Sequence, residues 1–217
     1  MKHFELTDTV FESRVSFNKV EVQTILIHLV NFGKLAYFDE LKIKSLKRFK
    51  CIDIKNANEW RHTFRQIKQE FQKTDNKIDY NRFRSYELAA YYKELKWNTN
   101  FKDWFILSAT KLATGFDHSW RRALIFCLIA GLLFYSLFYF SENYNYQFSL
   151  DKSKEFAAGY FRFLLVTDFY NPLSNGREYI QNDGWNHIIS WFIFIFGKIV
   201  IAFGIYEMIQ AFRKFKA

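Results

Sequence analysis

The side chains that most often perform chemistry are scattered in this sequence. The histidines share no metal-ligand spacing, and the two cysteines, Cys51 and Cys127, form neither a disulfide framework nor a zinc-type motif. There is no Gly-rich phosphate loop and no nucleophile elbow. We therefore expect no enzymatic activity, no cofactor and no metal. The histidines are His3, His28, His62, His118 and His187.

One charged residue stands in an unusual place, inside a long apolar segment near the end of the chain. Residues 185–206 are long enough to cross a bilayer, and Lys198 interrupts them near the middle. A charge at that depth costs on the order of 3 kcal/mol on insertion scales. Two interpretations stay open: the ammonium snorkels toward headgroups, or it faces a partner or an aqueous path.

A second apolar segment precedes it. Residues 123–140 are eighteen positions without a charged side chain, which as a helix span roughly 27 Å, close to the hydrocarbon thickness of a bilayer. Trp120, Arg121 and Arg122 stand before this run, as interfacial aromatic and basic residues do at the cytoplasmic end of a membrane span. The competing interpretation is a buried core helix of a soluble domain. We favour two membrane-spanning helices.

Charge asymmetry orients these spans. The segment 141–184 carries six acidic and four basic side chains, whereas basic residues flank the outer ends of both apolar segments. The positive-inside rule then places both termini in the cytoplasm and the loop outside. Residues 1–122 hold 23 basic against 15 acidic side chains, a surplus that suits anionic lipid. Nucleic acid is not favoured, because no basic stripe or nucleic-acid motif is present. The expected membrane anchors are Trp104, Trp120, Arg121, Arg122, Trp185, Arg213 and Lys214.

The loop between the spans contains a re-entrant-like segment, residues 156–172. Its apolar part is too short to cross twice, and Arg162 within it calls for a partner such as Asp168. A potassium-type filter relies on glycines, and this segment has none after its apolar part. The loop is therefore either structural or part of a less selective pore. The candidate pore and loop residues are Arg162, Thr167, Asp168, Phe169, Tyr170, Asn171 and Lys198.

Small residues form a stripe on each apolar segment. On the second they recur every seven residues, and on the first they cluster along one face. Small side chains let helix backbones approach closely in membranes. The stripes predict either pairing of the two spans within one chain or assembly into a homo-oligomer. They are Ala123, Cys127, Ala130 and Gly131, and Ser190, Gly197, Gly204 and Ala211.

The front of the chain divides in two. In residues 1–55, apolar pairs separated by one residue recur with a period of five: Val15/Phe17, Val20/Val22, Ile25/Ile27, Val30/Phe32 and Leu35/Tyr37. Ordinary strand alternation would not skip a position every fifth residue, so we predict roughly one coil of a β-helix rather than a hairpin.

A cytosolic helical hairpin is predicted over residues 56–100. Asn58 is the expected first cap, 74–76 the break, and the charged side chains a solvated surface. Residues 101–119 then predict an amphipathic helix at the membrane surface, with Trp104, Phe105, Leu107 and Leu112 as its apolar face. Residues 120–217 form the two-span membrane module. The expected fold class is thus a mainly α membrane protein with a short degenerate pentapeptide-repeat-like β segment.

Two stretches carry a family resemblance. Glu59 to Lys96, EWRHTFRQIKQEFQKTDNKIDYNRFRSYELAAYYKELK, followed by SATKLATGFDHSWRRAL, resembles the linker and cap of bacterial pentapeptide-repeat membrane proteins. The ending GKIVIAFGIYEMIQAFRKF is similar to the end of the C-terminal two-span, ion-channel-like module of that family. The resemblance covers most of the chain from residue 59 onward. It implies architecture more firmly than activity.

Three functions follow as hypotheses. The first is a non-enzymatic, oligomeric inner-membrane protein with a cytosolic sensing or docking domain and a channel-like or membrane-perturbing module, for which cell defence is one setting. The second is a non-conducting scaffold that is anchored in the membrane and recruits a cytosolic protein through residues 1–100. The third, least favoured, is a membrane-tethered hydrolase or nuclease.

Overall fold

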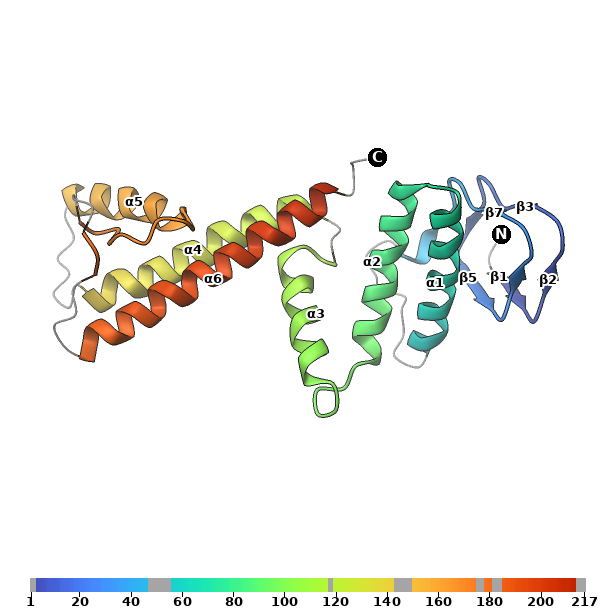
Figure 1. Cartoon of the computed structure of the whole chain (residues 1–217), viewed down its shortest axis with the longest axis horizontal. Helices are drawn as coiled ribbons and strands as arrows, with labels where there is room; N and C mark the ends of the chain where they lie inside the picture. Colours follow the sequence, from blue (N-terminus) through green and yellow to red (C-terminus); the bar gives the residue numbers. More distant parts are fainter. Residues whose placement is uncertain are drawn as a thin grey trace. The chain divides into compact units, whose positions relative to one another are not determined.

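The computed structural model describes residues 3–46, 56–116, 119–142, 150–174, 178–180 and 185–213. The chain folds into two compact units, Met1–His118 with Ala211–Ala217, and Ser119–Gln210. The described residues are mostly helical and the strands are short, which confirms the expected mainly α composition (Figure 1).

The strands form four parallel pairs, one on each side of a short β-helix. Each pair joins residues 21 positions apart, as in Phe4 with Ile25 and Val22 with Ile43. The chain therefore makes two stacked coils, where the sequence predicted about one. In order along the chain the strands are β1 His3–Thr7, β2 Val10–Phe11, β3 Val15–Ser16, β4 Glu21–Val22, β5 Thr24–His28, β6 Asn31–Phe32, β7 Ala36–Tyr37 and β8 Lys42–Ile43.

The 21-residue coil shows where the predicted period of five was wrong. Four sides of five residues make only twenty, so one side of each coil is a residue longer. The extra residue falls before β7 and shifts the inward pair from Leu35/Tyr37 to Ala36 and Phe38, which are each 1% exposed. Because neighbouring strand residues point to opposite faces, a shift of one residue exchanges inside for outside.

Matching residues of the two coils stack on one another. The ring of Phe11 stacks on Phe32 at 5.6 Å between centroids, and that of Phe17 on Phe38 at 5.1 Å. The corners match as well, because Asp8, Leu29, Lys19 and Glu40 all have φ between 47° and 59°. Such left-handed backbone is uncommon outside glycine, and its recurrence 21 residues apart shows that the coil geometry repeats.

Two antiparallel helices follow the β-helix, as predicted (Figure 1). They are α1 Ala57–Lys73 and α2 Lys77–Glu94, joined through a turn in which Asp75 is left-handed and Asn76 caps Asp79 N. The predicted cap Asn58 was wrong, since α1 begins two residues earlier than expected, at Ala57, and Asn56 occupies the cap position. A short 3-10 turn, Lys44–Leu46, ends the described part of the β-helix, and residues 47–55 of the predicted β segment lie outside the described residues.

The hairpin covers the open end of the second coil. Thr63 Oγ1 accepts from Ile27 N at 3.0 Å and donates to Ile27 O at 3.2 Å, and Glu70 Oε2 accepts from Ala36 N at 3.2 Å. Arg82, on α2, donates to Leu41 O at 3.0 Å. A buried strand edge needs partners for its peptide groups, and these side chains supply them.

The charged side chains of the hairpin are not simply a solvated surface, which corrects that expectation. Glu87 of α2 accepts from Arg65 at 3.0 Å and from Lys68 at 2.5 Å, both on α1. Arg61 pairs with Glu94 at 2.8 Å, again between the two helices. Burial by itself would raise the pKa of Glu87, but the bonds from Lys68 and Arg65 outweigh it and lower that pKa.

Helix α3, Phe101–Ala113, presents an apolar face that differs from the predicted one. Leu107 is buried against the hairpin and Trp104 is half-buried, stacked on Tyr92. Phe105 and Leu112 are exposed as expected. The side chains that complete the outward apolar surface are Trp97, Phe101 and Ile106.

The second unit is built from α4 Trp120–Glu142, α5 Leu150–Leu164 and most of α6 Trp185–Arg213. Helices α4 and α6 run antiparallel and meet every seven residues: Cys127 against Gly204, Phe134 against Gly197, and Ser141 against Ser190. A seven-residue repeat keeps one seam facing the partner helix. Both helices are long and apolar enough to cross a membrane. In each of them, 33% of the apolar 18-residue stretch is buried.

Candidate functional site

The charged group at the centre of the second unit is the ammonium of Lys198. It lies on α6, thirteen residues after Trp185, which is about 20 Å along the helix. The residue is 3% exposed. Its Nζ donates to the carbonyl oxygen of Phe163 at 2.8 Å and to that of Leu165 at 2.6 Å. The rings of Phe163 and Phe194 lie 5.2 Å from the same nitrogen.

These two carbonyls belong to the C-terminal end of α5. The last carbonyls of a helix have no intrahelical partner, and the helix dipole gives this end roughly half a negative charge. The ammonium of Lys198 donates hydrogen bonds to these carbonyls and places a positive charge at the negative end of the helix dipole. The two aromatic rings add cation–π attraction. The site therefore fixes the end of α5 to the middle of α6.

This geometry decides between the two interpretations of Lys198. A snorkelling side chain would extend along its helix toward the surface, but this one turns inward to α5. The partner that the second interpretation required is the backbone of the same chain. Asp168, in the turn after α5, lies near enough to attract the ammonium electrostatically.

The predicted pore and loop residues form a compact turn after α5. Arg162 donates to Ser174 O at 2.6 Å, and Asp168 accepts from the backbone N of Tyr170. The suggested pairing of Arg162 with Asp168 is therefore not made. Asn171 accepts from Leu173 N, and its own backbone N donates to Glu178 O. Thr167 and Phe169 are exposed.

Two backbone carbonyls at the start of this turn are already hydrogen-bonded within the chain. The carbonyls of Phe163 and Leu165 bind Lys198, and Leu165 O also accepts from Asp168 N. A carbonyl filter needs several oxygens directed at one axis. Within residues 156–174, the carbonyls of Phe163 and Leu165 are bound by the chain's own groups instead.

The small-residue stripes are used within one chain. A Cβ on Gly197 would lie 2.7 Å from the Phe163 ring, and one on Gly204 would lie 2.5 Å from Cys127 Sγ. Gly131 meets α5 in the same way, because a Cβ there would lie 2.5 Å from Leu164 Cδ2. Of the remaining stripe residues, Ala123, Ser190 and Ala211 are buried and Ala130 is half-buried. Several stripe residues thus pack within one chain, where α4, α5 and α6 meet.

Most predicted anchors lie at exposed helix ends. Trp120, Arg121 and Arg122 begin α4 and Arg213 ends α6, all of them exposed. Trp104 is half-buried in the first unit, where it stacks on Tyr92. Lys214 and the side chain of Trp185 lie outside the described residues.

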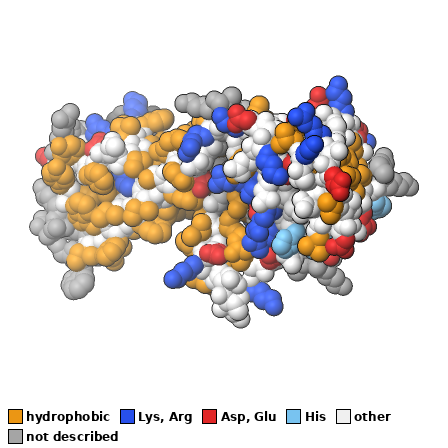
Figure 2. Space-filling view, turned by 45° about the vertical axis from the view of Figure 1, so that its right-hand side comes forward, with side chains coloured by type: hydrophobic (Ala, Val, Ile, Leu, Met, Phe, Trp, Pro, Cys, Tyr) orange, Lys and Arg blue, Asp and Glu red, His pale blue; other side chains and the backbone are white. Residues whose placement is uncertain are grey.

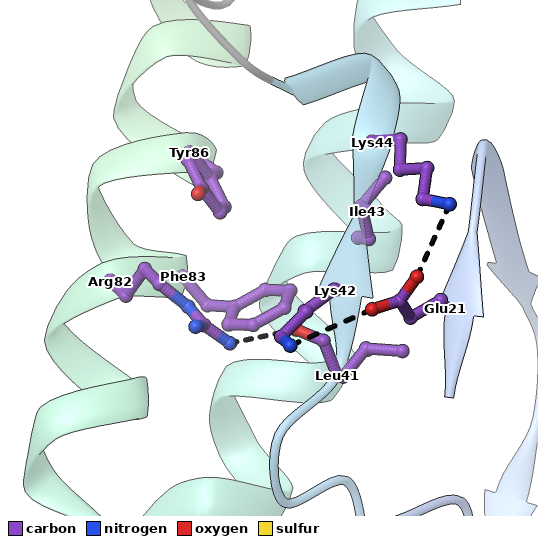
Figure 3. A pocket seen from close by; sticks show the side chains of 8 residues that line it. All are labelled: Glu21, Leu41, Lys42, Ile43, Lys44, Arg82, Phe83 and Tyr86. Atoms are coloured by element: carbon purple, nitrogen blue, oxygen red, sulfur yellow. Dashed lines mark hydrogen bonds and ion pairs between the residues drawn. The ribbon is translucent and has the colours of Figure 1, made fainter. Parts of the chain in front are cut away.

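The first unit has a charged cavity of about 260 Å³ between β8 and α2. Glu21 pairs with Lys44 at 3.2 Å and Lys42 at 3.6 Å, and these bonds, the one from Lys44 above all, lower the pKa of Glu21 (Figure 3). Arg82 binds Leu41 O and Asp79. The charged groups that line this cavity are thus already bound, Glu21 to the two lysines and Arg82 to Leu41 O and Asp79.

Among the described residues, no group of histidine, cysteine and acidic side chains could hold a metal ion. No protein-family model, curated protein or solved structure matches the chain. The site is therefore interpreted from its own geometry. Sequence reasoning named Lys198 but missed its partners, because a backbone carbonyl leaves no signal in a sequence.

Proposed function

We propose that this chain is an integral membrane protein, anchored by α4 and α6, that presents its β-helix domain to a cytosolic protein partner. The proposal rests chiefly on one observation: in α4 and in α6, only a third of the apolar 18-residue stretch that could cross a membrane is buried. A core helix of a soluble protein would be mostly buried. Figure 2 shows hydrophobic side chains over much of the visible face of these helices. Exposed examples are Ile125, Ile129, Leu133, Phe192, Phe196 and Ile199.

The helix before the first span supports the same location. Helix α3 ends at Ala113 and α4 begins at Trp120, so the chain between them reaches at most about 25 Å. The outward Phe101, Phe105 and Leu112 therefore lie within reach of the headgroup region. An exposed apolar stripe next to a span suits a helix that lies in the membrane interface.

The β-helix is the part that can recognise a protein. Its second coil is sealed by α1 and α2, so the outer faces of the four sides remain for a partner. The proposed resemblance to pentapeptide-repeat membrane proteins implies a coil of four sides with inward pairs, and the coil here has these features but is one residue longer than four repeats of five. In this proposal the two-span module is a packed anchor, because Lys198 closes the end of α5 on α6.

Membrane insertion and topology can be tested in bacterial cells. In a Cys51→Ser, Cys127→Ala background, cysteines at Lys34 and Glu178 report the two sides. We expect the protein in the carbonate-resistant membrane fraction, with Glu178→Cys labelled from outside by an impermeant maleimide and Lys34→Cys labelled only after lysis. Extraction by carbonate would refute the anchor, and the reverse labelling would refute the orientation.

A channel-like oligomer is the second candidate, favoured by the geometry of α5. This helix directs its C-terminal carbonyls to the middle of α6, where they bind a cationic group. Flux through liposomes that contain the purified protein tests it, together with its particle mass in detergent. A monomeric protein without flux would favour the first proposal, the anchored docking protein. An oligomer whose flux changes in Lys198→Leu would support the pore.

A further inference from the structure

The β-helix has an open end, formed by its first coil, opposite the end that α1 and α2 cover. Within the described residues, each strand of the first coil is paired with one strand of the second coil and with no other. The amides of Val15 and Phe17 donate toward the second coil, so the amide of Ser16 between them lies on the open side. A strand edge with unpaired peptide groups is a template on which another strand can pair.

The inward side chains of the first coil form an apolar layer that is covered on one side only. The ring of Phe17 contacts that of Phe4 at 5.4 Å and that of Phe11 at 6.3 Å between centroids. Their counterparts one coil further on include four residues that are at most 2% exposed, Ile25, Ile27, Phe38 and Leu41. The matching side chains of the first coil are all half-buried: Phe4, Leu6, Phe17 and Val20. Another coil stacked on this end would bury them to the same degree.

A second copy of this chain fits the open end. The other end of the β-helix is sealed by Thr63, Glu70 and Arg82, so copies cannot stack head to tail. Two open ends can stack on each other, which gives a closed dimer with two-fold symmetry rather than a growing fibre. A coil of 21 residues also reaches the lower bound of the roughly 20–30 residues that a specific interface uses on each side.

The charges around the first coil are complementary under such a two-fold rotation. Asp8 lies at the corner between β1 and β2, and Lys19 at the opposite corner, between β3 and β4. A two-fold axis through the other two corners places Asp8 of each copy over Lys19 of the other. The same rotation brings Glu12 of one copy to Arg14 of the other, because these exposed residues flank a corner on the axis. Opposite charges that meet across an interface fix its register.

We propose that two copies of this chain form a dimer by stacking the open ends of their β-helices, first coil against first coil. The half-buried apolar layers meet at the two-fold axis, the free strand edges pair, and Asp8 of each copy binds Lys19 of the other. Glu5 then faces Glu21, whose two lysine partners compensate the added charge. The inference goes beyond the proposed function and does not depend on the membrane anchor.

Disulfide cross-linking of the full chain tests the dimer and its orientation. In the cysteine-free background used for topology, Asp8→Cys/Lys19→Cys should form a disulfide between two copies when a fresh cell lysate is oxidised with copper phenanthroline. Stacked strands lie about 4.8 Å apart, and a disulfide joins Cα atoms up to about 7 Å apart. The matched control is Leu29→Cys/Glu40→Cys, at the same corners of the second coil. These positions would be three strand spacings apart in the dimer, about 14 Å, so no cross-link is expected. No cross-linked dimer for the first pair, or equal cross-linking of both pairs, overturns the proposal.

A charge reversal tests the same contact in the purified full chain. Asp8→Lys places a lysine over Lys19 and should raise the dimer dissociation constant about tenfold, measured by light scattering over a dilution series in detergent. Asp8→Lys/Lys19→Asp restores opposite charges and should recover the dimer. Glu40→Lys is the matched control, because it makes the same reversal at an exposed corner of the second coil.

The melting temperature of each variant separates a lost contact from a lost fold. A wild type that is monomeric at every concentration overturns the proposal, as does a dissociation constant that Asp8→Lys leaves unchanged. A charge swap that fails to recover the dimer at an unchanged melting temperature overturns it as well. Lys198→Leu, the variant of the pore test, should keep this dimer, which distinguishes stacking of the β-helices from assembly of the two-span units.

Discussion

The Nζ of Lys198 lies 2.8 Å from the carbonyl oxygen of Phe163, and this bond joins the middle of α6 to the end of α5. The lysine is buried, and both its carbonyl partners come from the same helix end. A charge that would oppose insertion on an isolated helix is thereby compensated inside the unit. The relationship makes α5 a packed part of the second unit rather than a loose loop between α4 and α6.

Lys198→Met should destabilise the two-span unit. The variant keeps an apolar stem but removes the Lys198 donor from the carbonyl of Phe163 and one of two donors from that of Leu165, which costs about 2 kcal/mol or more. Thermal unfolding of the purified protein in detergent measures the effect, with Lys34→Met on the β-helix as control. An unchanged midpoint for Lys198→Met would show that the bond does not hold α5.

Gly197→Val should disrupt the seam between α4 and α6. Even a Cβ at this position would be 2.7 Å from the Phe163 ring and 2.8 Å from Phe134 Cβ. Overpacking of this kind costs about 1–3 kcal/mol. Unfolding in detergent measures the loss, and Ile199→Val, on the exposed face of α6, is the control.

The particle mass of the same Gly197→Val variant in detergent distinguishes packing of the small residues within one chain from self-association through them. If the stripes serve packing within one chain, the variant loses stability at unchanged mass. A shift from oligomer to monomer at unchanged stability would instead assign the stripe to self-association.

Thr63→Val should open the capped end of the β-helix. The variant keeps the shape of the side chain but leaves both peptide groups of Ile27 without partners, at a cost of about 2 kcal/mol or more. Thr63→Ser, which retains the hydroxyl, is the matched control. Hydrogen exchange of the Ile27 amide gives the readout, and equal protection in Thr63→Val and wild type would contradict the capping role.

The ion pairs of Glu87 predict a dependence of stability on pH. The folded state lowers the pKa of Glu87 below its ordinary value of 4.5, so folding is favoured by the charged form. This contribution is present above the unfolded-state pKa and is lost as pH falls through the lowered pKa. Thermal unfolding between pH 7 and pH 3 should show a smaller loss for Glu87→Gln than for the wild type. Glu12→Gln, at an exposed position, should behave like the wild type, and parallel curves for all three proteins would exclude this role.

Leu133→Arg tests the proposal that one surface of α4 faces lipid. The side chain is exposed in the chain, so the change should cost little in a soluble protein. In a membrane span an arginine costs about 2.5–3.5 kcal/mol. We expect a smaller carbonate-resistant fraction for Leu133→Arg and no change for Val10→Arg, an exposed position on the β-helix. Full insertion of Leu133→Arg would argue against a lipid-exposed face.

Local patterns determined much of the architecture. Three predicted features are present: a long helix over the uncharged run 123–140, a second long helix that carries the small residues spaced by seven, and a break in the hairpin at residues 74–76. These signals are readable because the period of side chains along a helix or coil is fixed by backbone geometry. The same regularity misled at Ala36, where one extra residue in the coil was invisible to a strict period of five.

Only the tertiary structure decided what the polar groups do. Thr63 and Glu70 look like ordinary helix surface in the sequence, yet they bind the peptide groups of the β-helix edge. Lys198 was recognised as unusual, but its partners are carbonyls, which every residue carries. Tyr135 and Gly159 meet through folding of α5 onto α4. A sequence records side-chain types and spacings, whereas hydrogen bonding to the backbone and the space between helices depend on how distant segments pack.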